Sequence, residues 1–144
     1  MKIQALGHVV VRVTDIARAE QFYGDVLGLP ICARFDENGL RMTFFTLGDH
    51  HDFAVMEVPG DAATTEGAGL HHVAFKIGDS LDQLREARTR LEAAGVATDP
   101  IDHEVTKSLY MADPDGNGVE LYVDASAIWK TEPQRVAQLS PLAL

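Results

Sequence analysis

The sequence predicts an α+β fold made of two copies of a βαβββ module, because features of its first half recur in its second. Strand-like segments open both halves, at 7–13 and 70–77, and place His8 and His72 at equivalent positions 64 residues apart. An amphipathic, helix-like segment follows each of these strands. Three short strand candidates follow each helix, so the order of elements is the same in both halves.

Both predicted helices have recognisable ends. Apolar residues recur at helical spacing over about 16–27 and again over about 81–94. Gly28 is placed to end the first helix, and Ser80 with Gln83 forms a capping box at the start of the second. These signals indicate one helix in each module.

Turn-forming residues separate the remaining strands. We expect these at about 30–36, 41–47 and 51–58 in the first half and at about 98–103, 105–112 and 118–124 in the second. Module one therefore covers about 4–58, a linker 59–69, and module two about 70–124. Together they are predicted to form a single domain, 1–126. A C-terminal tail, 127–144, follows and is interpreted as a surface arm or an interface segment.

The composition argues against several classes of partner. The chain has 144 residues, 12 Lys and Arg against 22 Asp and Glu, and a net charge of −10. Its basic residues form no cluster, so neither nucleic acid nor an anionic membrane surface is an expected partner. No apolar run approaches the roughly 20 residues of a membrane span, and no signal peptide is recognisable. We therefore expect a cytoplasmic protein.

Strand alternation gives three candidate metal ligands. The apolar residues of each opening strand face the helix, so His8 and His72 face the opposite, open side of the sheet. Glu120 lies between two apolar residues of the last strand and faces the same open side, where an unpaired carboxylate is costly to bury. Two imidazoles and a carboxylate form a facial triad that suits non-haem Fe(II). Ordinary hydrogen-bonded strand residues are the alternative interpretation.

These motifs, in this order, resemble the vicinal oxygen chelate superfamily. That superfamily includes glyoxalase I, fosfomycin-resistance transferases, bleomycin-binding proteins and type I extradiol dioxygenases. The resemblance covers about residues 4–124 and rests on Gly7-His8, the helix end Phe22–Gly28, the strand Leu70–Phe75, and the turn Asp113–Asn117 leading to Glu120. It implies paired modules that curl into an open, cup-like barrel around a divalent metal, and it supports His8, His72 and Glu120 as ligands.

Within the superfamily the chain is most similar to one-domain extradiol dioxygenases. His51-Asp52 resembles the site of their acid–base histidine, and Tyr110, 10 residues before Glu120, matches the tyrosine that binds the catechol. The segment around His103 resembles their second-shell histidine more loosely. The resemblance implies an enzyme, commonly a homodimer, that uses Fe(II) and O₂ to open a catechol-type aromatic diol.

Other activities remain open alternatives at the level of sequence. Glu57 lies 63 residues before Glu120 and is a candidate fourth ligand, as in glyoxalase- or epimerase-type isomerases that use Ni or Zn. Mn is a further alternative metal. A fosfomycin-type thiol transferase and a non-catalytic protein that binds small molecules complete the alternatives.

Overall fold

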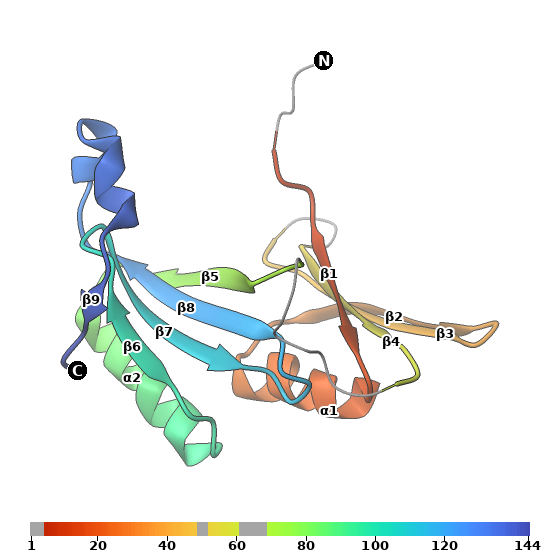
Figure 1. Ribbon diagram of the computed structural model, residues 1–144. Coiled ribbons are helices and arrows are strands. Elements are labelled where there is room, and N and C mark those ends of the chain that lie inside the picture. The colour runs from red at the N-terminus through yellow and green to blue at the C-terminus, as the bar shows by residue number, and fades with distance from the viewer. Residues whose placement is uncertain (1–4, 49–51, 61–68) are drawn as a thin grey trace. The chain divides into compact units, whose positions relative to one another are not determined.

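The computed structural model describes residues 5–48, 52–60 and 69–144 and divides into two compact units, which Figure 1 shows with their helices and strands labelled. The first unit comprises residues 1–66 and 113–117, and the second comprises 67–112 and 118–144. Each contains one mixed sheet with a helix on one face. The predicted α+β class with paired βαβββ modules is confirmed. That both modules share a single domain, 1–126, remains a prediction.

The first unit follows the expected order of elements. These are β1 (Val9–Val13), α1 (Ile16–Glu20), η1 (Gln21–Val26), β2 (Ile31–Glu37), β3 (Leu40–Phe45) and β4 (Phe53–Glu57). The sheet order is β1-β4-β3-β2, with β1 and β4 parallel and the other pairs antiparallel. The parallel pair holds the opening strand beside the last strand of the module.

The first helix is not uniform along its length. The Asp15 side chain caps it by accepting from the backbone N–H of Arg18, at 3.0 Å. From Gln21 the helix widens into a π-helical segment, in which the N–H of Leu27 donates to the carbonyl of Phe22. Gly28 then adopts a left-handed conformation with φ of 83° and ends the helix, as the sequence predicts.

The second unit repeats the arrangement and extends it. Its elements are β5 (His72–Gly78), α2 (Leu81–Ala93), β6 (Asp99–Asp102), β7 (Thr106–Ala112), β8 (Gly118–Asp124), η2 (Ile128–Lys130), η3 (Pro133–Ala137) and β9 (Ser140–Pro141). The sheet order is β5-β8-β7-β6-β9, with β5 and β8 parallel. The predicted capping box of α2 is present. Strand β9 comes from the tail and adds a fifth strand, which the sequence does not predict.

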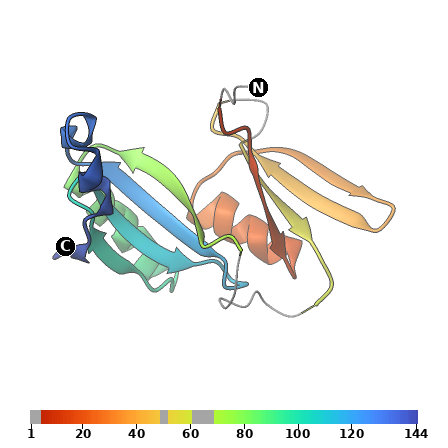
Figure 2. The same cartoon turned by 45° about the horizontal axis from the view of Figure 1, so that its top comes forward.

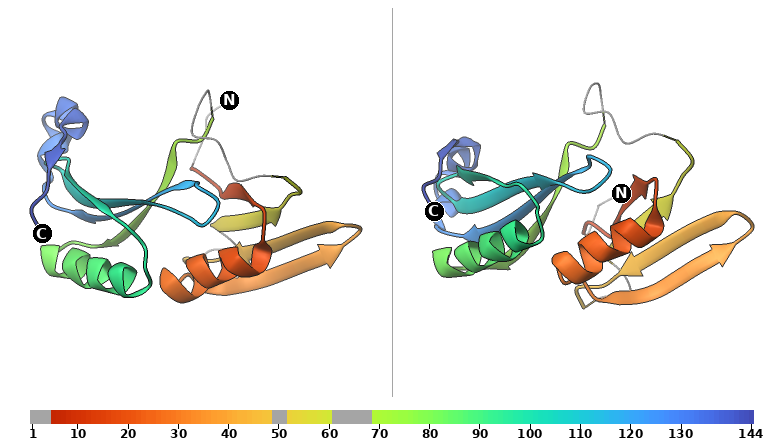
Figure 3. Two further views of the ribbon diagram at one scale, coloured as in Figure 1. Left: turned by 60° about the horizontal axis from the view of Figure 1, so that its bottom comes forward. Right: turned by 90° about the horizontal axis from the view of Figure 1, so that it is seen from below.

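Each helix covers the apolar face of its own sheet (Figures 2 and 3). In the first unit Tyr23 is fully buried, with its ring centroid 4.6 Å from that of Phe53 and 6.1 Å from that of Phe45. In the second unit Leu84 and Leu91 of α2 are buried with apolar residues of β7 and β8. Burial of these side chains stabilises each sheet and leaves its opposite face open for polar residues.

The tail does not form an independent element but folds onto the second unit. We call residues 127–144 the C-terminal arm. It contains η2, η3 and β9, and in Figure 3 it stands on the side of the sheet away from α2. No helix in the described part of the chain is long and apolar enough to cross a bilayer.

Candidate metal and substrate site

Two of the three predicted metal ligands face each other on the open face of the second sheet. The Nε2 atom of His72, on β5, lies 3.1 Å from Oε2 of Glu120, on the neighbouring strand β8. The Glu120 side chain is 8% exposed and that of His72 is 31% exposed, so the carboxylate is buried and the imidazole lies at its edge. An imidazole nitrogen and a carboxylate oxygen in this position fit a divalent transition metal.

A serine that the sequence analysis did not single out orients the carboxylate. Ser108 on β7 is fully buried, and its hydroxyl donates to Oε1 of Glu120 at 2.6 Å. This leaves Oε2 directed at His72. Carboxylates that bind metals are commonly held by such hydrogen bonds, which fix their orientation. Strand alternation could have identified Ser108, because it lies two residues before Tyr110 on the same strand.

Gly118 permits the close approach of the strand that carries His72. It pairs with His72 across β5 and β8, and a Cβ atom at this position would meet the carbonyl oxygen of His71 at 2.2 Å. That distance is well below any van der Waals contact. Glycine at 118 is therefore required for β5 to hold this position beside β8.

His71 supports His72 through the other ring nitrogen. The two Nδ1 atoms are 2.7 Å apart, so one of them carries the shared hydrogen. If Nε2 of His72 binds a metal, its Nδ1 is protonated and donates to His71. His71 is thus a neighbour that orients the His72 ring rather than one of the three predicted ligands.

Tyr110 and His103 form a hydrogen-bonded pair beside the two ligands. Nε2 of His103 lies 2.9 Å from the Tyr110 hydroxyl, and the Tyr110 ring meets the His72 ring edge to face, with centroids 5.3 Å apart. Burial and the nearby carboxylate of Glu120 raise the pKa of Tyr110 to about 12. The phenol is therefore protonated at neutral pH and can donate a hydrogen bond.

The C-terminal arm determines which His103 nitrogen carries the proton. Nδ1 of His103 lies 2.9 Å from the backbone carbonyl of Gln138, and a carbonyl can only accept. In the neutral ring Nδ1 is therefore the donor and Nε2 accepts from the Tyr110 hydroxyl. A backbone carbonyl of the arm has no sequence signature, so this part of the site could not be predicted.

The remaining predicted ligand belongs to the other unit. His8 directly precedes β1 and, by alternation, faces the open side of the first sheet with Val10. Over residues 5–48, 52–60 and 69–144, no three His, Cys, Asp or Glu side chains gather into a metal site. His51, the proposed acid–base residue, lies outside the described residues.

The register does not support Glu57 as the counterpart of Glu120. Val10 corresponds to Ala74, and their partners across the parallel strands are Ala54 and Glu120, respectively. Ala54 thus occupies the position that Glu120 has in the second module. Glu57 pairs with Val13 on the helix-covered face instead.

The contacts of Glu57 agree with that register. Its Oε1 accepts from the backbone N–H of Ile16 at 2.9 Å, and its Oε2 is 2.7 Å from Nη1 of Arg41. Both carboxylate oxygens are therefore engaged, Oε1 at the start of α1 and Oε2 by Arg41 on β3. The alignment by sequence offset missed a difference in length between the two modules.

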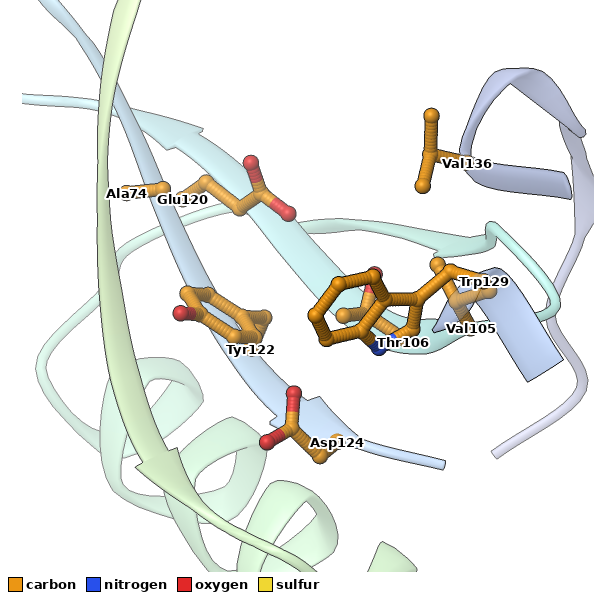
Figure 4. A pocket seen from close by; sticks show the side chains of 8 residues that line it. All are labelled: Ala74, Val105, Thr106, Glu120, Tyr122, Asp124, Trp129 and Val136. Atoms are coloured by element: carbon orange, nitrogen blue, oxygen red, sulfur yellow. The ribbon is translucent and has the colours of Figure 1, made fainter. Parts of the chain in front are cut away.

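A pocket of about 310 Å³ opens on the same sheet face (Figure 4). Its floor is the open face of β5, β7 and β8, and the arm supplies one wall. The residues that line it are Ala74, Val105, Thr106, Glu120, Tyr122, Asp124, Trp129 and Val136. A candidate metal ligand, Glu120, therefore lies in the floor of a cavity large enough for a small aromatic molecule.

Comparison with known proteins agrees with this architecture. Over 125 residues the chain is 35% identical to biphenyl-2,3-diol 1,2-dioxygenase 3 of Rhodococcus globerulus, covering 83% of this chain and 63% of that protein. It is 31% identical to the catechol-2,3-dioxygenase of Bacillus subtilis, covering 83% and 41%. The chain thus spans under two thirds of the length of these relatives. Other similar proteins are named lactoylglutathione lyase and glutathione transferase, at 27–28% identity.

Solved structures support the fold. The glyoxalase/bleomycin resistance protein/dioxygenase domain from Frankia sp. superposes with a TM-score of 0.73 at 21% identity, covering 85% of this chain and 99% of that one. The family model of the glyoxalase/bleomycin resistance protein/dioxygenase superfamily matches residues 5–121. The chain therefore belongs to this superfamily, the vicinal oxygen chelate superfamily that its sequence motifs resemble.

Proposed function

We propose that this protein is an extradiol ring-cleaving dioxygenase that acts on a catechol-type aromatic diol with Fe(II) and O₂. One observation carries the proposal. Tyr110, a protonated phenol held by His103, lies beside the pair His72 and Glu120 on the open face of one sheet. A hydrogen-bond donor next to metal ligands is what binding of a diol oxygen requires. The names of the two dioxygenase relatives support this choice.

The proposed metal ligands are His8, His72 and Glu120. A bound Fe(II) ion with three protein ligands supplies open coordination positions, lowers the pKa of a bound hydroxyl and allows reaction with O₂. The chain orients the ligands: Ser108 holds the Glu120 carboxylate and His71 holds the His72 ring.

The proposed proton chemistry belongs to three side chains. Tyr110 turns its hydroxyl toward the diol oxygen, and Nε2 of His103 accepts the hydroxyl hydrogen when no substrate is present. His51 is proposed as the acid–base residue that would donate and accept protons during the reaction. The arm, which supplies one wall of the pocket, shields one side of the diol from bulk water.

The number of ligands favours the dioxygenase over an isomerase. The counterpart of Glu120 in module one is Ala54, and Glu57 is bonded to Arg41 and to the start of α1. Three proposed ligands leave more coordination positions for substrate than four would. A cytoplasmic, homodimeric enzyme remains part of the proposal.

Oxygen uptake tests the proposed reaction. The protein is purified without oxygen, loaded with Fe(II) and mixed with a panel of catechols in an oxygen-electrode cell. We expect consumption of about one O₂ per diol and a yellow ring-opened product. Absence of uptake across the panel, with iron bound, would refute the dioxygenase. The metals Ni(II) and Mn(II) with hemithioacetals or fosfomycin and a thiol then test the alternatives.

Metal content tests the ligands separately from turnover. We expect His8→Ala, His72→Ala and Glu120→Ala each to lose stoichiometric Fe(II), measured by metal analysis after gel filtration. Retention of iron by one variant would remove that residue from the ligand set. We expect His51→Ala to keep its iron and lose turnover, and full activity of this variant would exclude His51 from the mechanism.

A further inference from the structure

We propose that the C-terminal arm forms the specificity wall of the substrate pocket, and that it selects uncharged aromatic diols with an apolar substituent. The proposal rests on the proposed function, because it concerns the substrate of the same site. Trp129 of η2 and Val136 of η3 line the pocket opposite Glu120 and Tyr122 of β8, all within the second unit (Figure 4).

The arm is attached to the second unit by strand pairing, a hydrogen bond and an ion pair. Ser140 and Pro141 of β9 pair with β6, and the carbonyl of Gln138 holds Nδ1 of His103 at 2.9 Å. Arg135, next to Val136, is 2.9 Å from Oε1 of Glu104, in the turn between β6 and β7. These contacts, within η3 and directly after it, anchor the backbone that carries Val136.

The two apolar side chains of the arm are only partly packed. Trp129 is 46% exposed and Val136 is 56% exposed, although both border the cavity. Exposed aromatic surface in a concave site is a place where burial by a ligand is favourable. A substituent on the diol ring that reaches this wall would cover apolar area that water now contacts.

The charges around the pocket disfavour anionic substrates. Its described lining contains two carboxylates, Glu120 and Asp124, and no lysine or arginine. The nearby Lys76 is held at 2.6 Å by both Asp124 and Asp79. Lys130 lies over the Trp129 ring, with Nζ 5.7 Å from its centroid. A carboxylate or phosphonate on the substrate would therefore find no lysine or arginine in the described lining to pair with, and burial of an unpaired charge is unfavourable.

Tryptophan fluorescence provides a direct test, because Trp129 is the only tryptophan of the chain. The Fe(II)-loaded protein is titrated without oxygen, so that binding is measured without turnover. We expect biphenyl-2,3-diol to change the emission saturably, and 3,4-dihydroxybenzoate to bind much more weakly. Binding detected by calorimetry with no response from Trp129 would overturn the proposal, as would absence of diol binding.

Substitutions on the arm test the wall itself. We expect Trp129→Ala to reduce the preference for biphenyl-2,3-diol over catechol, a ratio of calorimetric Kd values, by about tenfold. Leu139→Ala is the matched control, because Leu139 is an exposed apolar residue of the same arm that does not line this pocket. An unchanged ratio in Trp129→Ala would refute the apolar wall.

A matched pair of charge variants tests the exclusion of anions. Val136→Lys places a cation at the pocket, and we expect it to strengthen binding of 3,4-dihydroxybenzoate about fivefold. Leu139→Lys adds the same charge to the arm away from the pocket, and we expect no change. Equal effects of the two variants would contradict the assignment of this wall.

The outcomes separate the two proposals. Diol binding that depends on Trp129, without oxygen uptake, would support the wall and refute the dioxygenase. Oxygen uptake with the substrate preference unchanged in Trp129→Ala would refute the wall and support the dioxygenase.

Discussion

Removing the Ser108 hydroxyl should weaken both the fold and the proposed metal site. Ser108 is fully buried, and its bond to Oε1 of Glu120 is 2.6 Å long. In Ser108→Ala this buried carboxylate oxygen loses its donor and no water can easily replace it. Hydrogen bonds to charged groups contribute about 1.5–3 kcal/mol, so we expect the metal-free variant to lose that much free energy of unfolding.

Two effects on metal affinity oppose each other in this variant. A carboxylate left without its donor gains more from a bound cation, which favours binding. The same carboxylate is no longer held with Oε2 toward His72, which disfavours binding. Removal of such supporting hydrogen bonds typically costs 10–100-fold in affinity, so orientation should prevail. We therefore expect Fe(II) binding to weaken by about tenfold or more.

Urea unfolding of the metal-free protein and competition with a chelator measure the two quantities separately. Ser140→Ala is the control, because Ser140 is an exposed serine of β9 in the same unit. Its unfolding free energy should change by no more than about 0.5 kcal/mol. If Ser108→Ala matched this control in both assays, the hydrogen bond would not orient Glu120 and the reasoning would fail.

Three further substitutions test other contacts. Glu57→Gln should retain full metal content, since its carboxylate bonds to Arg41 rather than a metal; lost metal would reinstate it as a ligand. Gly118→Ala should displace the strand that carries His72 and lower metal affinity, measured by chelator competition, because the new Cβ meets backbone at 2.2 Å. Burial raises the pKa of Tyr23 above its ordinary value of about 10. The protonated Tyr23 hydroxyl therefore contributes fully to the free energy of unfolding below about pH 10, and this contribution is lost as the pH rises above it. Tyr23→Phe should cost about 1–3 kcal/mol at pH 8, a difference shrinking by about 1.4 kcal/mol per pH unit above pH 10 in urea titrations.

The strands were predictable because apolar side chains, which face the covering helix, alternate with other side chains along each strand. Observed β8, Gly118–Asp124, matches the predicted 118–124, and β4, Phe53–Glu57, lies within the predicted 51–58. The π-helical turn of η1 was not predictable, because the choice between bonding four or five residues back depends on packing rather than on spacing.

The site was predictable where it depends on side chains in strands. His72, Glu120 and Tyr110 lie on one open face because strand alternation fixes their side, and the structure brings them together. Glu57 shows the limit of this reasoning. Glu57 lies three residues after Ala54, and a shift by an odd number of residues exchanges the two faces of a strand. An offset counted along the sequence cannot detect such a shift.

The arm was not predictable for a different reason. Its contacts with the rest of the second unit include two paired residues of β9, a backbone carbonyl that bonds to His103, and the ion pair of Arg135 with Glu104. None of these contacts requires apolar residues at regular spacing in the sequence. The sequence of the arm therefore does not indicate a packed element, although the arm is attached to β6 and lines the pocket.

The two modules differ at the positions where chemistry is proposed. In the second module, Glu120 of β8 pairs with Tyr110 of β7, and in the first the corresponding pair is Ala54 and Phe44. The proposed ligand histidines occupy equivalent positions in both modules, whereas the carboxylate and the phenol occur only in the second. A symmetric site would have four protein ligands and less room for substrate oxygens. The alanine at 54 in place of a carboxylate agrees with the proposed dioxygenase, in which the open coordination positions of the metal would receive the diol and O₂.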